Sequence, residues 1–274
     1  MWSELCTLTA DSASQVVCCP GGLEVAGKRF SGDLGRTGAW RVEMCQLGME
    51  GLLARQGGLV RGFVEYCPGE VAPLPVEAPG AAVLLCYHWV PPEDAPGEEH
   101  LAQEGQLVGQ ALQLIRSRFS GVAALGWDHP THFPIALLGE LGFQEVERRD
   151  YLSLMWLPFS AAARPPGWVP AVFRPQDLSG ERLLAVEVGW SSRCPYSVHH
   201  AARVGQVLAG LPDAAQSLIR ARFHRVDTRA DAVSTSRHPW DWDWLFLNGT
   251  PVDHRRTGSD DLRRAIEQGV EGMR

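Results

Sequence analysis

The sequence predicts an α/β protein of two domains, and three observations lead to this prediction. An apolar run at 81–90 precedes a helical pattern at 101–118, and a second apolar run follows at 121–126. A buried strand, an amphipathic helix and another strand in this order are typical of a crossover between parallel strands. Five prolines between 158 and 175 then mark a change of composition, which is typical of a domain boundary.

The other elements of the first domain follow from local signals. Two glycines, Gly57 and Gly58, separate two apolar segments and can both take positive φ, so they predict a hairpin turn. Gly142 ends a short helical pattern. The predicted elements are a helix at 40–48, strands at 52–56 and 59–66, a proline-rich loop at 68–79, a helix at 133–141 and two strands within 143–157.

The second domain begins with an apolar strand and alternates strands with helices. Ser259 is the predicted cap of the last helix, because a serine side chain can accept a hydrogen bond from the first helical turn. The predicted elements are a strand at 183–188, a helix that follows residues 191–197 and reaches 211, strands at 222–226 and 244–247, and a helix at 260–268.

Composition excludes several classes of function. With 274 residues and 45% hydrophobic content, the chain is long and apolar enough for domains with real cores. The net charge is −7 and no Lys/Arg stripe is visible, so we expect no nucleic-acid partner. No apolar run approaches the roughly 18 residues that cross a bilayer, so we expect no membrane partner. The start of the chain lacks signal-peptide features, and seven cysteines favour free thiols, so we expect a cytoplasmic protein.

Two side chains on the central strands are candidates for catalysis. Glu65 lies on a strand that would neighbour the strand at 81–90, so its carboxylate could face an acceptor cleft as a general base. The alternative is an exposed or ion-paired strand carboxylate. Cys86 could act as a nucleophile, although a buried and inert thiol is the simpler interpretation. We predict no metal site.

Three further clusters have structural and functional interpretations. Cys18 and Cys19 precede a Pro-Gly turn, which favours a strand end over a metal site, because adjacent cysteines do not easily ligate one ion. Asp128, His129 and His132 could bind a substrate or a metal, but capping of a helix by Asp128 is simpler. The alternating tryptophans from Trp240 to Trp244 favour packing over an aromatic ligand cage.

The order of elements between Leu52 and Leu157 resembles the GCN5-related N-acetyltransferase (GNAT) fold, a mixed sheet flanked by helices. Residues Cys86 to Val90 resemble the strand that splays to admit acetyl-CoA, and 141–143 resemble the end of the later helix. The resemblance implies that the backbone near Trp89 and Val90 contacts the pantetheine arm and the thioester. It also implies a loop that binds the pyrophosphate, with the cofactor-binding residues Gly105, Gln106, Val108, Gly109 and Gln110.

The chain departs from the family's loop pattern at two positions. Glu104 stands where the family has Arg or Gln, and Leu107 replaces a Gly. A Cβ at position 107 would crowd a phosphate, and each nearby carboxylate would repel it by about 0.5–1 kcal/mol. Leu138 stands where many members carry the Tyr that protonates the leaving thiolate. The alternative function is therefore a protein that has lost acetyl-CoA and uses the cleft and its thiols for another small-molecule reaction or for binding.

The second domain resembles a small thioredoxin fold. Cys194, followed by Pro-Tyr-Ser at a strand-to-helix junction, resembles a monothiol glutaredoxin-type site, and Ser197 prevents a disulfide within that motif. The pair at 250–251, Thr-Pro, resembles the dipeptide whose cis-proline faces the active thiol. An acetyltransferase-like domain at 1–157, a proline-rich linker at 158–180 and a YoaP-like thioredoxin-fold domain at 181–274 together resemble one narrow protein family.

Three hypotheses of function result. The first is an acyl-CoA-dependent N-acetyltransferase that acts on a small-molecule or peptide amine. The second is the alternative without acetyl-CoA. The third is an interaction module in which the second domain docks a partner or forms a homodimer. The first depends on a wedge that opens beside residues 86–90 and admits a ligand. Side chains that plug this wedge and leave no cavity between the neighbouring strands would contradict it.

Overall fold

The computed structural model describes residues 2–16, 31–90, 97–128, 133–237, 243–253 and 257–274. The chain divides into two units, Met1–Pro170 and Ala171–Arg274. The boundary between them falls inside the proline-rich stretch at 158–180. Among the described residues, no helix is long and apolar enough to cross a membrane.

The first unit is built on a mixed sheet with the strand order β1-β2-β3-β5-β6-β8-β7. Its central neighbours β5 and β6 are parallel, and the other neighbours pair in the antiparallel direction. The expected mixed sheet is therefore confirmed. The strands are β1 (Glu4–Thr7), β2 (Glu50–Gln56), β3 (Leu59–Pro68), β5 (Ala82–Trp89), β6 (Gly121–Trp127), β7 (Gln144–Arg149) and β8 (Leu152–Pro158).

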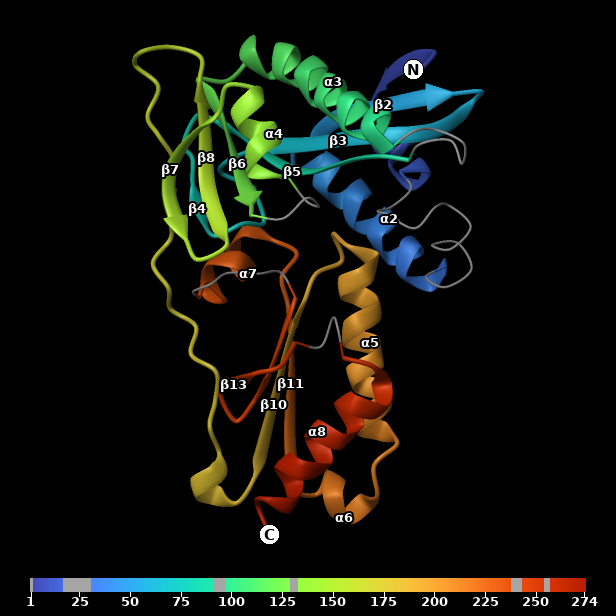
Figure 1. The fold of residues 1–274 in the computed structure, drawn as a ribbon, viewed down its shortest axis with the longest axis vertical. Coiled ribbons are helices and arrows are strands. Elements are labelled where there is room, and N and C mark those ends of the chain that lie inside the picture. The colour runs from blue at the N-terminus through green and yellow to red at the C-terminus, as the bar shows by residue number, and fades with distance from the viewer. Residues whose placement is uncertain (1, 17–30, 91–96, 129–132, 238–242, 254–256) are drawn as a thin grey trace. The chain divides into compact units, whose positions relative to one another are not determined.

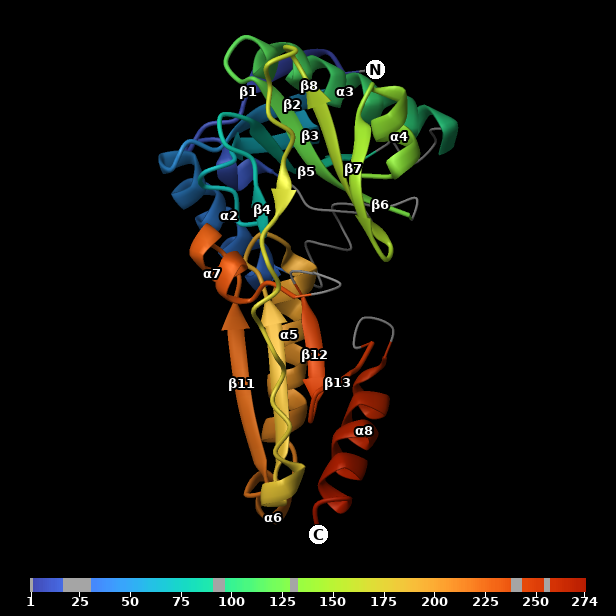
Figure 2. The same ribbon diagram turned by 90° about the vertical axis from the view of Figure 1, so that its left-hand side faces the viewer.

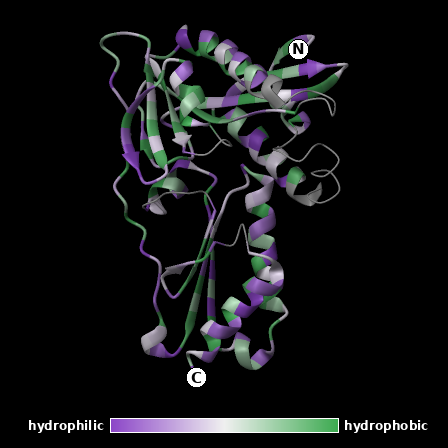
Figure 3. Ribbon diagram, viewed as in Figure 1, coloured by the Kyte–Doolittle hydropathy of each residue, from purple (hydrophilic) through white to green (hydrophobic). Residues whose placement is uncertain are grey.

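Helices cover both faces of this sheet, with α3 on one side and α2 on the other (Figure 1). The main core lies between α3 and the sheet, and it joins residues of β2, β3, β5, β6 and β8 to one face of α3. The edge strand β7 is largely hydrophilic (Figure 3), as expected where one edge faces solvent. The helices are α2 (Ser31–Gln46), α3 (Gly97–Arg116), α4 (Ile135–Glu140) and the short η1 (Ala13–Gln15).

The predicted hairpins are confirmed. Gly57 and Gly58 join β2 to β3 with φ of 59° and 79°, a turn that L-residues with side chains rarely adopt. Asp150, with φ of 60°, turns the chain from β7 into β8. A two-stranded ladder of β4 (Val76–Glu77) and β9 (Gly167–Trp168) completes the unit.

The second unit has a sheet with the order β11-β10-β12-β13. Strands β10 and β11 are parallel, while β12 is antiparallel to β10 and to β13. Helices α5 and α8 pack on the same face of this sheet and form its core (Figures 1 and 2). The elements are η2 (Ser179–Glu181), β10 (Leu184–Trp190), α5 (Pro195–Ala209), α6 (Asp213–Gln216), β11 (Ile219–Arg225), α7 (Arg229–Ser234), β12 (Trp244–Leu247), β13 (Thr250–Pro251) and α8 (Ser259–Glu271).

Helix boundaries differ from the predictions by a few residues. Helix α3 begins at Gly97, four residues before the predicted start at 101, and α2 begins at Ser31, well before Trp40. The last helix is capped by Gly258, so the prediction that Ser259 is its cap is wrong. Local propensity places helix ends poorly, because caps depend on the path of the preceding chain.

Candidate functional site

Strands β5 and β6 are neighbours along only a small part of their length. Their register pairs Ala82 with Val122 and Val83 with Ala123, and the remaining residues of both strands have no ladder partner across this edge. A bulge in the β3–β5 ladder shifts β5 by one residue just beyond this point. Bulges bend a strand and re-aim its backbone groups. The two parallel strands therefore diverge, as expected for the wedge.

The backbone N–H of Trp89 lies on the diverging edge of β5. The next residue, Val90, donates its N–H to the carbonyl oxygen of Arg61 on the β3 side, at 2.7 Å. Because successive N–H groups of a strand point to opposite edges, the Trp89 N–H points away from β3. The Val90 N–H is already used within the sheet, so the structure does not support the prediction that this amide contacts a cofactor.

A carboxylate from α3 accepts the hydrogen bond of the Trp89 amide. The Trp89 N–H donates to Oε1 of Glu104 at 3.1 Å, and the same oxygen lies 3.2 Å from Nδ1 of His88. Only 6% of Glu104 and 8% of His88 are exposed. A buried carboxylate is costly unless hydrogen bonds compensate it, and the Trp89 N–H supplies one, with the imidazole of His88 beside it.

Glu104 reaches this position because it lies on the apolar stripe of α3. Val108, Ala111 and Ile115, which are fully buried, follow it at spacings of four, seven and eleven residues. These spacings place all four side chains on the face that packs against the sheet. A carboxylate on an otherwise apolar helical stripe indicates a buried polar contact, so the sequence could have predicted this site from Glu104. His88 was not predicted from the sequence.

The residues of the predicted pyrophosphate loop are helical. Residues 104–110 lie inside α3, where backbone N–H groups donate to carbonyl groups one turn earlier. Such amides cannot cradle a phosphate. Leu107 and Val108 are fully buried in the main core, and Gln106 and Gln110 are exposed on the outer face of the helix. The predicted cofactor contacts of Gly105, Gln106, Val108, Gly109 and Gln110 therefore lose their physical basis.

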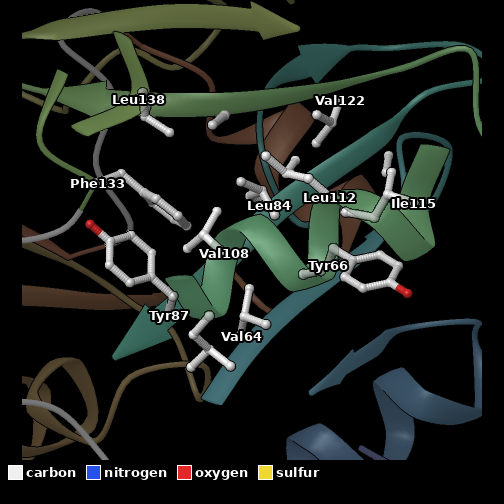
Figure 4. Close-up of a cluster of buried hydrophobic side chains, with 14 of the residues drawn as sticks. Val64, Tyr66, Leu84, Tyr87, Val108, Leu112, Ile115, Val122, Phe133 and Leu138 are labelled. Carbon is white, nitrogen blue, oxygen red and sulfur yellow. The ribbon is translucent and has the colours of Figure 1, made fainter. Parts of the chain in front are cut away.

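Apolar side chains lie between the diverging strands on the α3 side. The ring of Tyr87 on β5 packs against Phe133, just before α4, with ring centroids 4.3 Å apart. Figure 4 shows Phe133 between Tyr87 and Leu138, with Val108 beside the two rings, and all four side chains belong to one buried cluster. Leu138 contributes no hydroxyl group at the position where the family resemblance expects Tyr. Apolar side chains thus cover the α3 side of the sheet beside the wedge, while the edges of β5 and β6 beyond Val83 and Ala123 have no ladder partner across the wedge.

Glu65 does not face a cleft. It is completely buried and forms an ion pair with Arg41 of α2, whose guanidinium also lies over the ring of Phe63 at 5.3 Å. The ion-paired alternative is therefore what the structure contains. A general base must reach a substrate proton, and this carboxylate has no exposed surface. Burial, with a contribution from Glu65, also raises the pKa of the Cys45 thiol on the same helix.

Cys86 is the cross-strand partner of Glu65, so both side chains lie on the α2 face of the sheet. Its thiol is partly buried and lies 4.0 Å from the carbonyl oxygen of Tyr87. Trp89 and Tyr87 belong to the core on the other face. The sheet therefore separates Cys86 from the apolar side of the wedge.

In the second unit, Cys194 is the N-cap of α5 and follows the carboxyl end of β10. The connecting loop is held from two sides. Asp227 accepts hydrogen bonds from the N–H of Ser192 at 2.6 Å and the hydroxyl of Ser191 at 3.2 Å, and Ser197 accepts the N–H of Ser191 at 2.9 Å. Ser197, which stands where a dithiol motif has its second Cys, is thus a buried anchor of this loop. The structure therefore brings Cys194 to a hydrogen-bonded strand-to-helix junction at the end of a parallel pair of strands.

The predicted role of the Thr-Pro pair at 250–251 is wrong. These residues form β13, where Thr250 pairs with Leu247, and Leu247 pairs with Val186 near the start of β10. Cys194 follows the other end of β10, beyond Trp190. At about 3.3 Å per residue, the length of the strand separates Thr250 from the thiol. This pair cannot face Cys194.

Several predicted positions lie outside the described residues, namely Cys18, Cys19, His129, His132, Trp240 and Trp242. Asp128 follows the last residue of β6, its side chain is 73% exposed, and its carboxylate lies 3.6 Å from the guanidinium of Arg148. Trp244 is buried in β12 and packs on Phe173 and Phe246, which agrees with the packing interpretation. In the described part of the chain, no group of three potential ligands could hold a metal ion.

No family model matches the chain, and no curated protein matches it. Among solved structures, it is similar to an aminoglycoside 6'-acetyltransferase type Ii, with 14% identity, a TM-score of 0.40, and coverage of 59% of this chain and 99% of that one. It is also similar to a GNAT-family acetyltransferase from Brucella melitensis in complex with acetyl-CoA, with 17% identity, a TM-score of 0.36, and coverage of 59% of this chain and 92% of that one. The ribosomal-protein-S18-alanine N-acetyltransferase from Escherichia coli has 15% identity and a TM-score of 0.36, with coverage of 59% of this chain and 96% of that one. Likeness this distant assigns neither an activity nor a substrate to the chain.

Proposed function

We propose that the first unit is an acyl-CoA-dependent N-acetyltransferase that acts on a small-molecule or peptide amine. The observation that carries the proposal is the divergence of two parallel central strands, β5 and β6, after two paired residues. Such a divergence leaves backbone donors and acceptors of β5 without a strand partner, and these groups can bind the amides of a pantetheine arm. The crossover helix α3 and the strand order agree with the fold that the sequence resembles.

The residues present fit part of acetyl-CoA. When bound, acetyl-CoA supplies the activated thioester. The Trp89 N–H on the diverging edge would hold a carbonyl oxygen of the arm or of the acyl group, once it is released from Glu104. The first turn of α3 at 97–100 has N–H groups without partners inside the helix, so it replaces 104–109 as the proposed seat of the pyrophosphate.

The net charge of the chain, −7, opposes a polyanion at this seat. Negative charge near the first turn of a helix competes with a bound phosphate for the helix dipole. We therefore expect acetyl-CoA to bind weakly, and we expect additional phosphate groups on the ligand to raise its affinity little. Proton transfer to the acceptor amine is not assigned to Glu65, because that carboxylate is buried in an ion pair.

For the second unit we propose a thioredoxin-like appendage with a single thiol. Its strand order, with β10 and β11 parallel and β12 antiparallel, supports this proposal, as does the position of Cys194 at the start of α5. Ser197 cannot form a disulfide with Cys194, so the thiol acts alone or with an external partner. Reaction of Cys194 with glutathione disulfide, followed by mass spectrometry of the intact chain and of Cys194→Ser, tests this part.

Isothermal titration of the full chain with acetyl-CoA tests the main proposal. We expect saturable binding below millimolar Kd, and release of free CoA when the chain and acetyl-CoA are mixed with a panel of amines. Absence of binding at near-millimolar acetyl-CoA would contradict acetyl transfer and would favour the alternative, a protein that uses this region for other small-molecule chemistry or for binding.

A further inference from the structure

The carboxylate of Glu104 accepts the hydrogen bond of the Trp89 N–H, the backbone group that the proposed acyl donor would bind. We infer that Glu104 is an internal occupant of the carbonyl-binding position at the Trp89 amide, and that a ligand binds there by displacing it. This inference rests on the proposed function, because the ligand that competes is a pantetheine-type amide chain. It assigns to Glu104 a role in setting the affinity of the wedge, whereas the family resemblance placed this residue on a pyrophosphate loop.

The contact involves the diverging edge of β5 and not merely the helix. Trp89 is 1% exposed, so its N–H requires an acceptor whether or not a ligand is present. Neither β3 nor β6 supplies one, since β3 lies on the opposite edge and β6 has already turned away. Glu104 supplies the acceptor at 3.1 Å. A carbonyl oxygen from a ligand is a chemically equivalent acceptor.

The contact can be exchanged without leaving a buried group unsatisfied. When a ligand carbonyl accepts the Trp89 N–H, Glu104 retains His88, whose Nδ1 lies 3.2 Å from its Oε1. His88 therefore serves as the partner that keeps the carboxylate compensated in both arrangements, and it positions Glu104 without itself touching the ligand's carbonyl position.

The affinity of the ligand measures how strongly Glu104 competes with a ligand carbonyl for the Trp89 N–H. A hydrogen bond to a charged group is worth roughly tenfold to a hundredfold in an equilibrium constant. Removal of the carboxylate in Glu104→Ala leaves the Trp89 N–H open, so a ligand that supplies a carbonyl should bind about tenfold or more tightly than to the wild type. Glu104→Gln keeps an acceptor oxygen but loses the charge, so its gain should be smaller than that of Glu104→Ala.

Three ligands distinguish competition for the Trp89 N–H from a long-range electrostatic effect of the Glu104 charge on phosphates. Pantetheine carries the amide arm without phosphates, 3′-phosphoadenosine 5′-diphosphate carries the phosphates without the arm, and CoA carries both. Titration calorimetry of each with wild type, Glu104→Ala and Glu104→Gln should give a gain for pantetheine and CoA and little or none for the nucleotide. Gln113→Ala on the exposed face of α3 and Glu140→Ala, a lost surface charge, are the matched controls and should bind like the wild type.

Each outcome decides the inference. Equal affinity of pantetheine for wild type and Glu104→Ala, an equal gain for all three ligands, or no binding to any variant overturns it. Binding of acetyl-CoA to the wild type with no gain in the variants leaves the proposed function standing and removes only the inference. Binding to Glu104→Ala alone supports the inference and counts against acetyl transfer by the native chain. In the ligand-free protein, the amide proton of Trp89 should move upfield in the NMR spectrum of Glu104→Ala, which checks the contact itself and the fold of the variant.

Discussion

The buried pair of Arg41 and Glu65 gives the sharpest prediction about the first unit. Both side chains are at most 1% exposed, and Glu65 Oε2 has no hydrogen-bond partner within the part of the chain that the structure describes. Glu65 therefore depends on Arg41 for compensation. Breaking such a pair by removing one partner costs about 3–5 kcal/mol, whereas replacing both partners by apolar residues of similar volume is often neutral. We expect Arg41→Met to destabilise the unit by that amount and Arg41→Met/Glu65→Leu to recover most of it.

The assay must report on the first unit alone, because two units of one chain can unfold separately. Native-state hydrogen exchange of the amides of β3 and β5 gives the free energy of unfolding of this unit. A cost below about 1 kcal/mol for Arg41→Met would refute the reasoning. So would a double variant as unstable as the single one. Titration of acetyl-CoA with Glu65→Gln separates the structural role from catalysis, since a structural carboxylate changes stability and leaves affinity unchanged.

Other predictions concern stability and pH. Glu104→Ala leaves the buried Trp89 N–H without its acceptor and should destabilise the first unit by about 1–3 kcal/mol, measured by hydrogen exchange. In Gly189→Ala the new Cβ would lie 2.1 Å from the ring of Trp244, so the second unit should lose about 1–3 kcal/mol in urea unfolding. The Ser153 hydroxyl, above all, lowers the pKa of Glu145 below its usual value of 4.5. Stability from this contact is therefore present above about pH 4.5 and lost as pH falls below it, and Ser153→Ala should flatten that part of the pH–stability curve.

Matched controls exist for these variants. Gly180→Ala adds a Cβ with no atom of the described chain within 4 Å, so it should unfold like the wild type. Equal losses for Gly180→Ala and Gly189→Ala would contradict the packing argument. A stability curve of Ser153→Ala that still falls as steeply as the wild type in acid would show that Glu145 does not contribute through this contact.

Elements with strong local signals were predictable from the sequence. The hairpin at Gly57 and Gly58 follows from backbone sterics, and the crossover from β5 through α3 to β6 follows from hydrophobic periodicity. The start of α3 at Gly97 was not predicted, and the family pattern placed a loop at 104–109, inside the helix that the apolar stripe at 101–118 predicts.

The failures in the candidate site have a common physical origin. The burial of Glu65 depends on Arg41, which is 24 residues away in the sequence, and the Thr-Pro pair depends on the register of β12 and β13. Neither pairing leaves a local pattern. Glu104 reaches the Trp89 N–H because β5 and β6 diverge and leave this edge of β5 open to a side chain from α3. Long-range contacts of this kind require coordinates.

The response of the Trp89 amide to acetyl-CoA tests the central claim most directly. In a 1H–15N titration of the full chain, binding between the diverging strands predicts saturable shifts of Trp89 and Tyr87, together with loss of the contact to Glu104. Saturable binding with shifts confined to residues 171–274, or no shift at Trp89 at near-millimolar acetyl-CoA, would contradict the account.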